Sequence, residues 1–127
     1  MCAAWTCFDV IYKLQSICGM EVRRYLTTGG RNVFSEWLAE LADRSAKARI
    51  ADRIDRLSRG NPGDCKALGG GLFELRIDWG PGYRIYYATI GQTCVLLLCG
   101  GDKRKQASDI RRARDYFKDY LQRTRIQ

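Results

Sequence analysis

The sequence predicts an α+β fold, a mostly antiparallel four-stranded sheet with two N-terminal helices packed on one face and a C-terminal helix. Helical spacing of apolar residues runs from about residue 33 to residue 59, and three strand-like segments follow between residues 72 and 99. A basic segment with helical spacing then ends the chain. This order of elements favours an arrangement with the helices on one face of the sheet.

The first half of the chain is predicted to form one short strand and two helices. Residues 22–26 mix apolar and charged side chains before a Gly-Gly pair, which is typical of a short strand. Asn32 is a good helix cap, and the segment 33–41 carries apolar residues at helical spacing. A second helix is predicted from about residue 44 to residue 59, where the sequence Gly-Asn-Pro-Gly at 60–63 ends it. The predicted core-facing residues are Phe34, Trp37, Leu38, Leu41, Ile50, Ile54 and Leu57.

The second half is predicted to form three strands and a helix. Residues 72–78 alternate apolar and charged side chains, the pattern of a half-buried strand. Residues 83–88 are rich in aromatic and β-branched side chains, and residues 93–99 are almost all apolar, so we expect the latter to be the central strand with both faces covered. Helical spacing returns from about residue 106 to residue 123.

Length and charge describe one basic domain. The 127 residues fit a single domain, and 22 Lys and Arg against 14 Asp and Glu give a net charge of +8. The basic surplus concentrates in residues 101–127, which favours polyanionic partners. Charged sequence begins at Met20, so we expect residues 1–19 to be an N-terminal extension outside the fold and residues 20–127 to be the functional domain.

Composition excludes several kinds of chemistry. The chain has no histidine, which removes imidazole bases and His-ligated zinc, and we expect neither a metal nor a cofactor. Its six cysteines form no CxxC pair, so buried thiols in a reducing, cytoplasmic location are the better interpretation. Residues 2–19 are interrupted by Asp9 and Lys13, too short and broken an apolar segment to span a bilayer.

Four basic residues are candidate catalytic groups. Arg76 and Arg84 lie on neighbouring predicted strands, Lys103 follows the last strand, and Lys66 lies in the predicted loop before the 72–78 strand. Fixed cations around one phosphate stabilise the charge that develops during phosphoryl transfer or RNA cleavage. The alternative is that the two arginines merely pair with Glu74 and Asp78 on a solvated sheet face, and composition alone favours that alternative.

A second group of residues is a candidate RNA-binding surface. Arg104, Lys105 and Arg111 belong to a basic run around the start of the last helix, which is either a phosphate-binding stripe or a solvated helix face. Tyr86 shares the predicted face of Arg84 and is the candidate for stacking on an unpaired base.

Six segments together carry a family resemblance. They lie at residues 20–26, 48–57, 60–66, 72–78, 82–87 and 96–103, and they include the strand motif Gly82-Tyr83-Arg84. With these segments the chain resembles the RelE/ParE toxin superfamily from Met20 to about Tyr120. It is most similar to the phage-derived addiction module killer proteins related to HigB.

The resemblance implies the small RelE-like fold and the toxin half of a type II toxin–antitoxin system. It further implies a metal-independent endoribonuclease that cuts mRNA on the ribosome, in which a 2′-hydroxyl attacks the adjacent phosphate. Arg84 matches the basic residue of the family's Gly-Tyr-Arg strand, and Arg76 and Lys103 fall near two other basic positions. The family's C-terminal tyrosine has no counterpart, since the nearest positions hold Asp109 and Ile110.

The resemblance also implies partners and leaves two alternatives. The expected partners are a cognate antitoxin of the helix-turn-helix class, the ribosome and mRNA, with no membrane. One alternative is a ParE-like toxin that poisons DNA gyrase without nuclease activity. The other is an inactive relative that only binds an antitoxin or nucleic acid.

Overall fold

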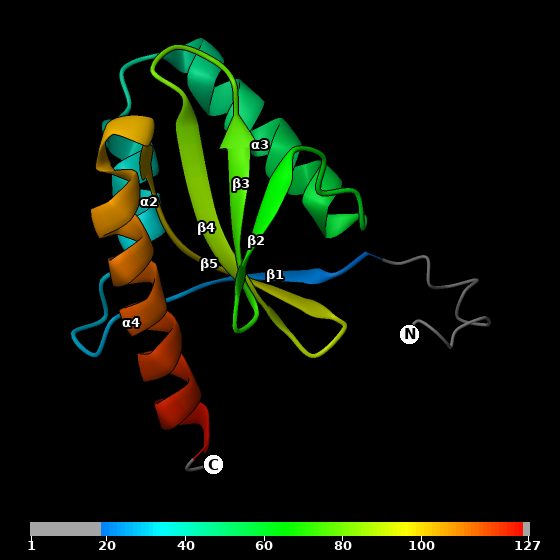
Figure 1. Cartoon of the computed structure of the whole chain (residues 1–127), viewed down its shortest axis with the longest axis vertical. Helices are drawn as coiled ribbons and strands as arrows, with labels where there is room; N and C mark the ends of the chain where they lie inside the picture. The colour runs from blue at the N-terminus through cyan, green and yellow to red at the C-terminus, as the bar shows by residue number, and fades with distance from the viewer. Residues whose placement is uncertain (1–18, 126–127) are drawn as a thin grey trace.

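The computed structural model describes residues 19–125, which form a five-stranded sheet, three α-helices and one short 3-10 helix (Figure 1). The predicted extension lies outside the described residues except for Gly19. In chain order the elements are β1 (Glu21–Arg24), α2 (Val33–Glu40), α3 (Arg44–Ser58), β2 (Cys65–Gly69), β3 (Leu72–Ile77), β4 (Tyr83–Ile90), β5 (Cys94–Asp102), η1 (Lys103–Lys105) and α4 (Gln106–Arg125).

The sheet has the strand order β1-β5-β4-β3-β2, so the prediction of four strands was one short. β1 runs parallel to β5, and the other neighbours are antiparallel. The strand that was missed, β2, lies at one edge, where its five residues are exposed or half-buried and show no alternation. It pairs with β3 through a turn in which Gly69, Gly70 and Gly71 all have positive φ, a conformation that glycine adopts at low cost.

The prediction that the apolar residues 93–99 form a strand with both faces covered is confirmed. Every residue of β5 from Cys94 to Gly101 is buried, and β5 lies between β1 and β4. The strand in the middle of the five is β4 rather than β5, because β2 adds one strand on the far side.

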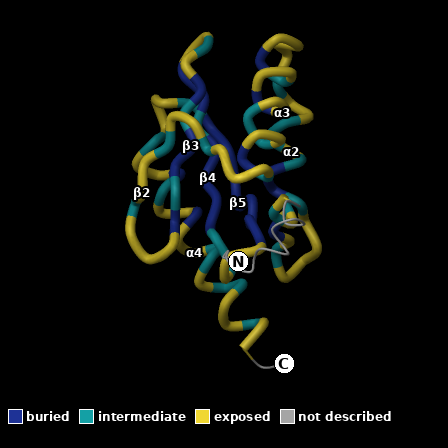
Figure 2. Tube along the Cα trace, turned by 90° about the vertical axis from the view of Figure 1, so that its right-hand side faces the viewer, coloured by how far each residue is buried: buried dark blue, intermediate teal, exposed yellow. Residues whose placement is uncertain are grey.

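Helices cover both faces of the sheet, which corrects the expectation that they share one face. Residues of α2 and α3 such as Phe34 and Ile50 pack with Leu75 and Ile85 in one core. α4 covers the opposite face, where Ala113 packs with a second set of sheet residues. Figure 1 shows α3 and α4 on opposite sides of the strands, and Figure 2 shows the buried strands between exposed outer surfaces.

Capping side chains fix where α2 and α3 begin. The Asn32 side chain accepts a hydrogen bond from the Ser35 amide at 3.0 Å, as predicted for a helix cap. Asp43 accepts from the amides of Ser45 and Ala46 at 2.9 and 3.2 Å, and its other oxygen accepts from the indole nitrogen of Trp79. The start of α3 is therefore tied to the loop that follows β3.

Candidate functional site

Arg76, Arg84 and Lys103 lie together at one end of the sheet, and we call them the cation cluster. Arg76 of β3 is directly opposite Arg84 of β4 in the antiparallel register. The turn before β4 brings Lys103 to the same place, because its amide donates to the Gly82 carbonyl at 2.9 Å. A Cβ atom on Gly82 would lie within 3.6 Å of both the Arg84 guanidinium and the Lys103 side chain.

A buried carboxylate lies beneath the two arginines. Glu74 is two residues before Arg76 on β3 and has no exposed surface. Arg76 Nε donates to its Oε1 at 3.0 Å, and Arg84 Nε lies 3.9 Å from its Oε2. The side chains of Tyr86 and Gln106 donate to Oε2 at 3.2 and 2.6 Å. The predicted alternative, in which the arginines pair with Glu74, is thus partly right, but the face is not solvated.

These contacts keep Glu74 ionised despite its burial. Burial raises the pKa of a carboxyl group, but the hydrogen bonds from Gln106, Arg76 and Tyr86 outweigh burial and hold the pKa of Glu74 below its ordinary value of 4.5. The same burial, with the charge of Glu74 nearby, raises the pKa of the Tyr86 hydroxyl far above its usual range. At neutral pH one negative charge therefore faces two arginines.

The cluster retains positive charge for an outside ligand. The Arg84 side chain is only 13% exposed, and its Nε has no hydrogen-bond partner among the described residues. The Arg76 side chain is 34% exposed, and Lys103 is exposed without an ion pair in the described chain. The three cations outnumber the one carboxylate beneath them, and the nearby Asp109 is paired with Arg112, so positive charge remains that suits a phosphate.

Lys66 belongs to a strand, which corrects its predicted place in a loop. It lies on β2 directly opposite Glu74, and its side chain is exposed. The row Lys66, Glu74, Tyr86 and Cys99 crosses four strands on the face that α4 covers. Lys66 is thus one strand away from the cluster, at the edge of the sheet.

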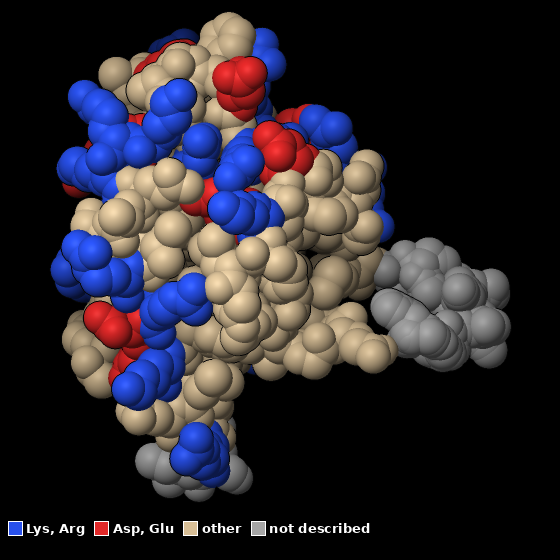
Figure 3. All heavy atoms as spheres, in the orientation of Figure 1, with Lys and Arg blue, Asp and Glu red and all other residues tan. Residues whose placement is uncertain are grey.

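The basic run around the start of α4 extends the positive surface. Figure 3 shows Lys and Arg side chains gathered over the end of the molecule where α4 begins. Arg104 pairs with Asp102 at 2.8 Å although its side chain is 78% exposed. Lys105 and Arg111 are exposed and form no ion pair within residues 19–125. Arg104 is thus partly neutralised by Asp102, whereas the charges of Lys105 and Arg111 face solvent.

Tyr86 does not fit the role of a base-stacking residue. Its side chain is fully buried in the core under α4, and its hydroxyl donates to Glu74. The prediction assumed that the sheet face on which Arg84 and Tyr86 lie is exposed to solvent along the whole strand. α4 covers that face beyond Arg84, so the ring offers no surface to a ligand.

Three residues at this end of the sheet were not among the predicted site residues. Glu74 and Gln106 connect β3 to the start of α4. Asp109 is buried, pairs with Arg112 at 2.9 Å through Oδ1, and leaves Oδ2 without a hydrogen-bond partner in the described chain. The sequence did contain a signal for these residues. The apolar face of α4 has to pack against the sheet, and the free sheet face is the one with the polar residues of β3 and β4.

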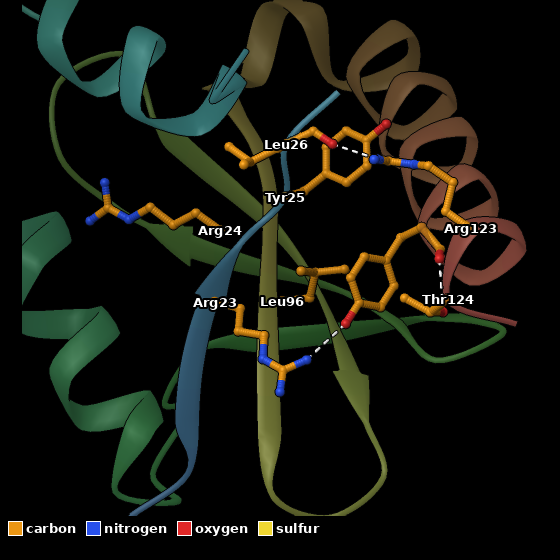
Figure 4. A pocket seen from close by; sticks show the side chains of 8 residues that line it. Arg23, Arg24, Tyr25, Leu26, Leu96, Arg123 and Thr124 are labelled. Atoms are coloured by element: carbon orange, nitrogen blue, oxygen red, sulfur yellow. Dashed lines mark hydrogen bonds between the residues drawn. The ribbon is translucent and has the colours of Figure 1, made fainter. Parts of the chain in front are cut away.

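A separate pocket lies at the other end of α4 (Figure 4). It has a volume of about 250 Å³, below the range of roughly 300–1,000 Å³ that small-molecule sites occupy. Arg23 donates to the Tyr120 hydroxyl at 3.0 Å, and Arg123 donates to the Leu26 carbonyl. Its lining residues are Arg23, Arg24, Tyr25, Leu26, Leu96, Tyr120, Arg123 and Thr124, none of which was a predicted site residue.

The described residues hold no group of three or more Cys, Asp or Glu side chains placed to bind a metal ion. Among the same residues, no helix combines the length and the apolar composition that crossing a bilayer requires.

The fold and the cluster define a small α+β protein that gathers three cations at one end of its sheet. The family described as phage-derived protein Gp49-like (DUF891) matches residues 36–118, and the chain belongs to this family. The Gp49-like family is a toxin family of toxin–antitoxin addiction modules, so an antitoxin is the implied partner. The matched residues include the whole cation cluster and Glu74.

A relative in Haemophilus influenzae (strain ATCC 51907 / DSM 11121 / KW20 / Rd), named only as an uncharacterized protein, is 51% identical over 81 residues. The alignment covers 64% of this chain and 82% of that protein.

Proposed function

We propose that this protein is a HigB-like toxin that cuts mRNA on the ribosome without a metal ion. The observation that carries the proposal is the cation cluster: Arg76 and Arg84 lie opposite each other over one buried carboxylate, with Lys103 beside them. Arginine side chains held in this way need little reorganisation when charge develops on a bound phosphate. Such fixed charges stabilise a phosphoryl-transfer transition state more than they stabilise the bound substrate.

In the proposed reaction the 2′-hydroxyl oxygen of one nucleotide forms a bond to the adjacent phosphorus and loses its proton. The bond from phosphorus to the 5′-oxygen breaks, and that oxygen gains a proton. The products are a 2′,3′-cyclic phosphate and a 5′-hydroxyl. Arg84, Arg76 and Lys103 hold and polarise the phosphate, and Lys66 assists from the neighbouring strand edge.

The start of α4 is the proposed surface for the rest of the RNA. Lys105 and Arg111 are exposed and unpaired in the described chain, and Arg104 follows Lys103 of the cluster directly in the sequence. Contacts of this kind position an RNA backbone without reading its sequence, and their affinity falls with salt. We propose that the cognate antitoxin, of the helix-turn-helix class, neutralises the toxin.

The test is expression in bacterial cells followed by primer extension on abundant mRNAs. We expect new 5′ ends inside reading frames with the wild-type chain and none with Arg84→Ala. The matched control is Arg44→Ala, which removes one exposed cation from the start of α3 and forms no part of the cluster. We expect this control to cut mRNA as the wild type does.

Growth arrest with intact mRNA would overturn the proposal. If gyrase cleavage complexes accumulate instead, and both Arg84→Ala and Lys103→Ala remain toxic, the ParE-like function is correct. If no variant or wild-type chain affects growth or mRNA, the chain is an inactive relative.

A further inference from the structure

Glu74 is the most completely buried charged residue in the described chain, and it lies next to the cation cluster rather than within the reach of a ligand. Its side chain has no exposed surface and sits in the middle of β3. Buried carboxylates are rare unless they are paired, because removal from water costs several kcal/mol per ion in real proteins. A hydrophobic residue would fill the same space at lower cost, so the carboxylate needs an explanation.

Both carboxylate oxygens of Glu74 accept hydrogen bonds. Oε1 accepts from Arg76 Nε at 3.0 Å, and Oε2 accepts from Gln106 Nε2 at 2.6 Å and from the Tyr86 hydroxyl at 3.2 Å. Arg84 Nε lies 3.9 Å from Oε2, beyond hydrogen-bond distance but within ion-pair distance. The carboxylate therefore contacts side chains from three elements, β3, β4 and α4.

These contacts constrain where the guanidinium groups lie. Arg76 uses Nε for Glu74, so its two terminal nitrogens remain for another acceptor. In Arg84, one terminal nitrogen donates to the Tyr83 carbonyl at 3.2 Å. Arginine recognises phosphate through paired N–H groups of fixed direction, so the direction of each fork decides whether a phosphate is bound productively.

We propose that Glu74 is a positioning residue: its buried carboxylate sets the directions of the Arg76 and Arg84 guanidinium groups so that both face one phosphodiester, while Glu74 itself does not touch the RNA. The hydrogen bond from Gln106 extends this role to the start of α4, directly after the segment that carries Lys103. The inference rests on the proposed function for the identity of the ligand, but the arrangement of the arginines can be tested without it.

The experiment compares the wild-type chain with Glu74→Gln, which keeps the size of the side chain and removes its charge. The matched control is Glu40→Gln, the same change at an exposed position at the end of α2. In a ribosome-dependent cleavage assay we expect kcat for Glu74→Gln to fall about 10- to 100-fold, with KM within about twofold of the wild type. Glu40→Gln is expected to match the wild type in both constants.

A second readout follows the arginines directly by NMR. In the wild type we expect the Nε–H signal of Arg76 to exchange slowly with solvent, and in folded Glu74→Gln we expect that signal to shift and to exchange faster. If the wild-type chain does not cut mRNA, the proposed function fails, and the NMR comparison alone decides the role of Glu74. Unchanged arginine signals, or wild-type kcat in a folded Glu74→Gln, overturn the positioning role.

Where Glu74→Gln does not fold, Tyr86→Phe and Gln106→Ala provide the same test. Each removes one hydrogen bond to Glu74 and leaves the charges of the cluster in place. We expect kcat to fall about three- to tenfold in each, together with a shift of the Arg76 Nε–H signal. Wild-type values in both variants contradict the proposal.

Discussion

The carboxylate oxygen Oδ2 of Asp109 lies closer to the position of a Cβ atom on Gly101 than van der Waals contact allows. Gly101 is opposite Arg84 in the sheet, so the absence of a side chain on β5 lets the first turn of α4 approach the cation cluster. The neighbouring Gly100 does the same on the other face, where the Trp37 ring takes the corresponding space. These two glycines thus admit one helix on each side of β5.

Gly101→Ala is expected to destabilise the protein. The added methyl group meets the buried Asp109 side chain, which must shift and give up part of its pairing with Arg112, and such overpacking costs about 1–3 kcal/mol. Urea unfolding measures the change. Gly29→Ala is the control, because a Cβ atom there meets only one side-chain oxygen at 3.9 Å. Equal stability of the two variants would contradict the packing described for α4.

The Gly100-Gly101 pair also explains one limit of prediction from sequence. Two consecutive glycines indicated the end of the last strand near residue 99, but β5 continues to Asp102. A glycine is needed at each position because a side chain from another element fills the space, and those elements are distant in sequence. The local pattern carries no sign of that requirement.

The other elements followed from local signals. The cap at Asn32, the apolar spacing of α2 and α3, and the alternation in β3 and β4 all act over a few residues, and those elements lie where the sequence placed them within one or two residues. β2 gave no such signal. It is an exposed edge strand without a buried face, so its sequence does not alternate between apolar and polar residues.

The candidate site could be predicted only in part. That Arg76 and Arg84 face the same way follows from strand alternation and a short turn. The burial of Glu74 and Tyr86 depends on which sheet face α4 covers, and this is decided by packing between distant segments. The charged residues at alternate positions of β3 predicted a solvent-exposed sheet face, but in the structure α4 covers part of that face.

Arg53→Ala is expected to destabilise the protein and to loosen the strand that carries Arg76. The Arg53 guanidinium donates to the carbonyls of Arg76, Pro62 and Asp64 at 2.6, 2.9 and 3.1 Å, which ties α3 to the start of β2 and the end of β3. Hydrogen bonds to a charged group contribute about 1.5–3 kcal/mol each, so we expect a loss of at least about 1.5 kcal/mol in urea unfolding. Arg53→Lys should recover part of that loss, and no loss in either variant would contradict this role.

Acid is expected to remove the stabilisation that Glu74 provides. Because the folded protein holds the pKa of Glu74 below 4.5, its ionised form stabilises the fold above about pH 4.5, and this contribution is lost as the pH falls through the lowered pKa. The difference in unfolding free energy between the wild type and Glu74→Gln should therefore shrink as the pH falls below about 4.5. A difference that stays constant as the pH falls would contradict a lowered pKa of Glu74 in the folded protein.

The buried thiols are expected to resist modification. Burial raises the pKa of Cys99 to about 12 and raises the pKa of Cys94, so both remain protonated thiols at pH 8. Cys65 is half-buried. In a variant with serine at positions 2, 7 and 18, we expect a thiol reagent to modify one cysteine in the folded protein and three in denaturant. Modification of all three without denaturant would contradict the burial of β5.

The most direct test of the central claim uses purified ribosomes programmed with a defined mRNA, the purified chain, and mapping of both RNA ends at any cut. The proposed function predicts a 2′,3′-cyclic phosphate and a 5′-hydroxyl with the wild type and with Arg44→Ala. It predicts loss of cutting with Arg84→Ala and Lys103→Ala while both remain folded. Intact mRNA with the wild-type chain, or cutting by both cluster variants at the wild-type rate, would contradict it.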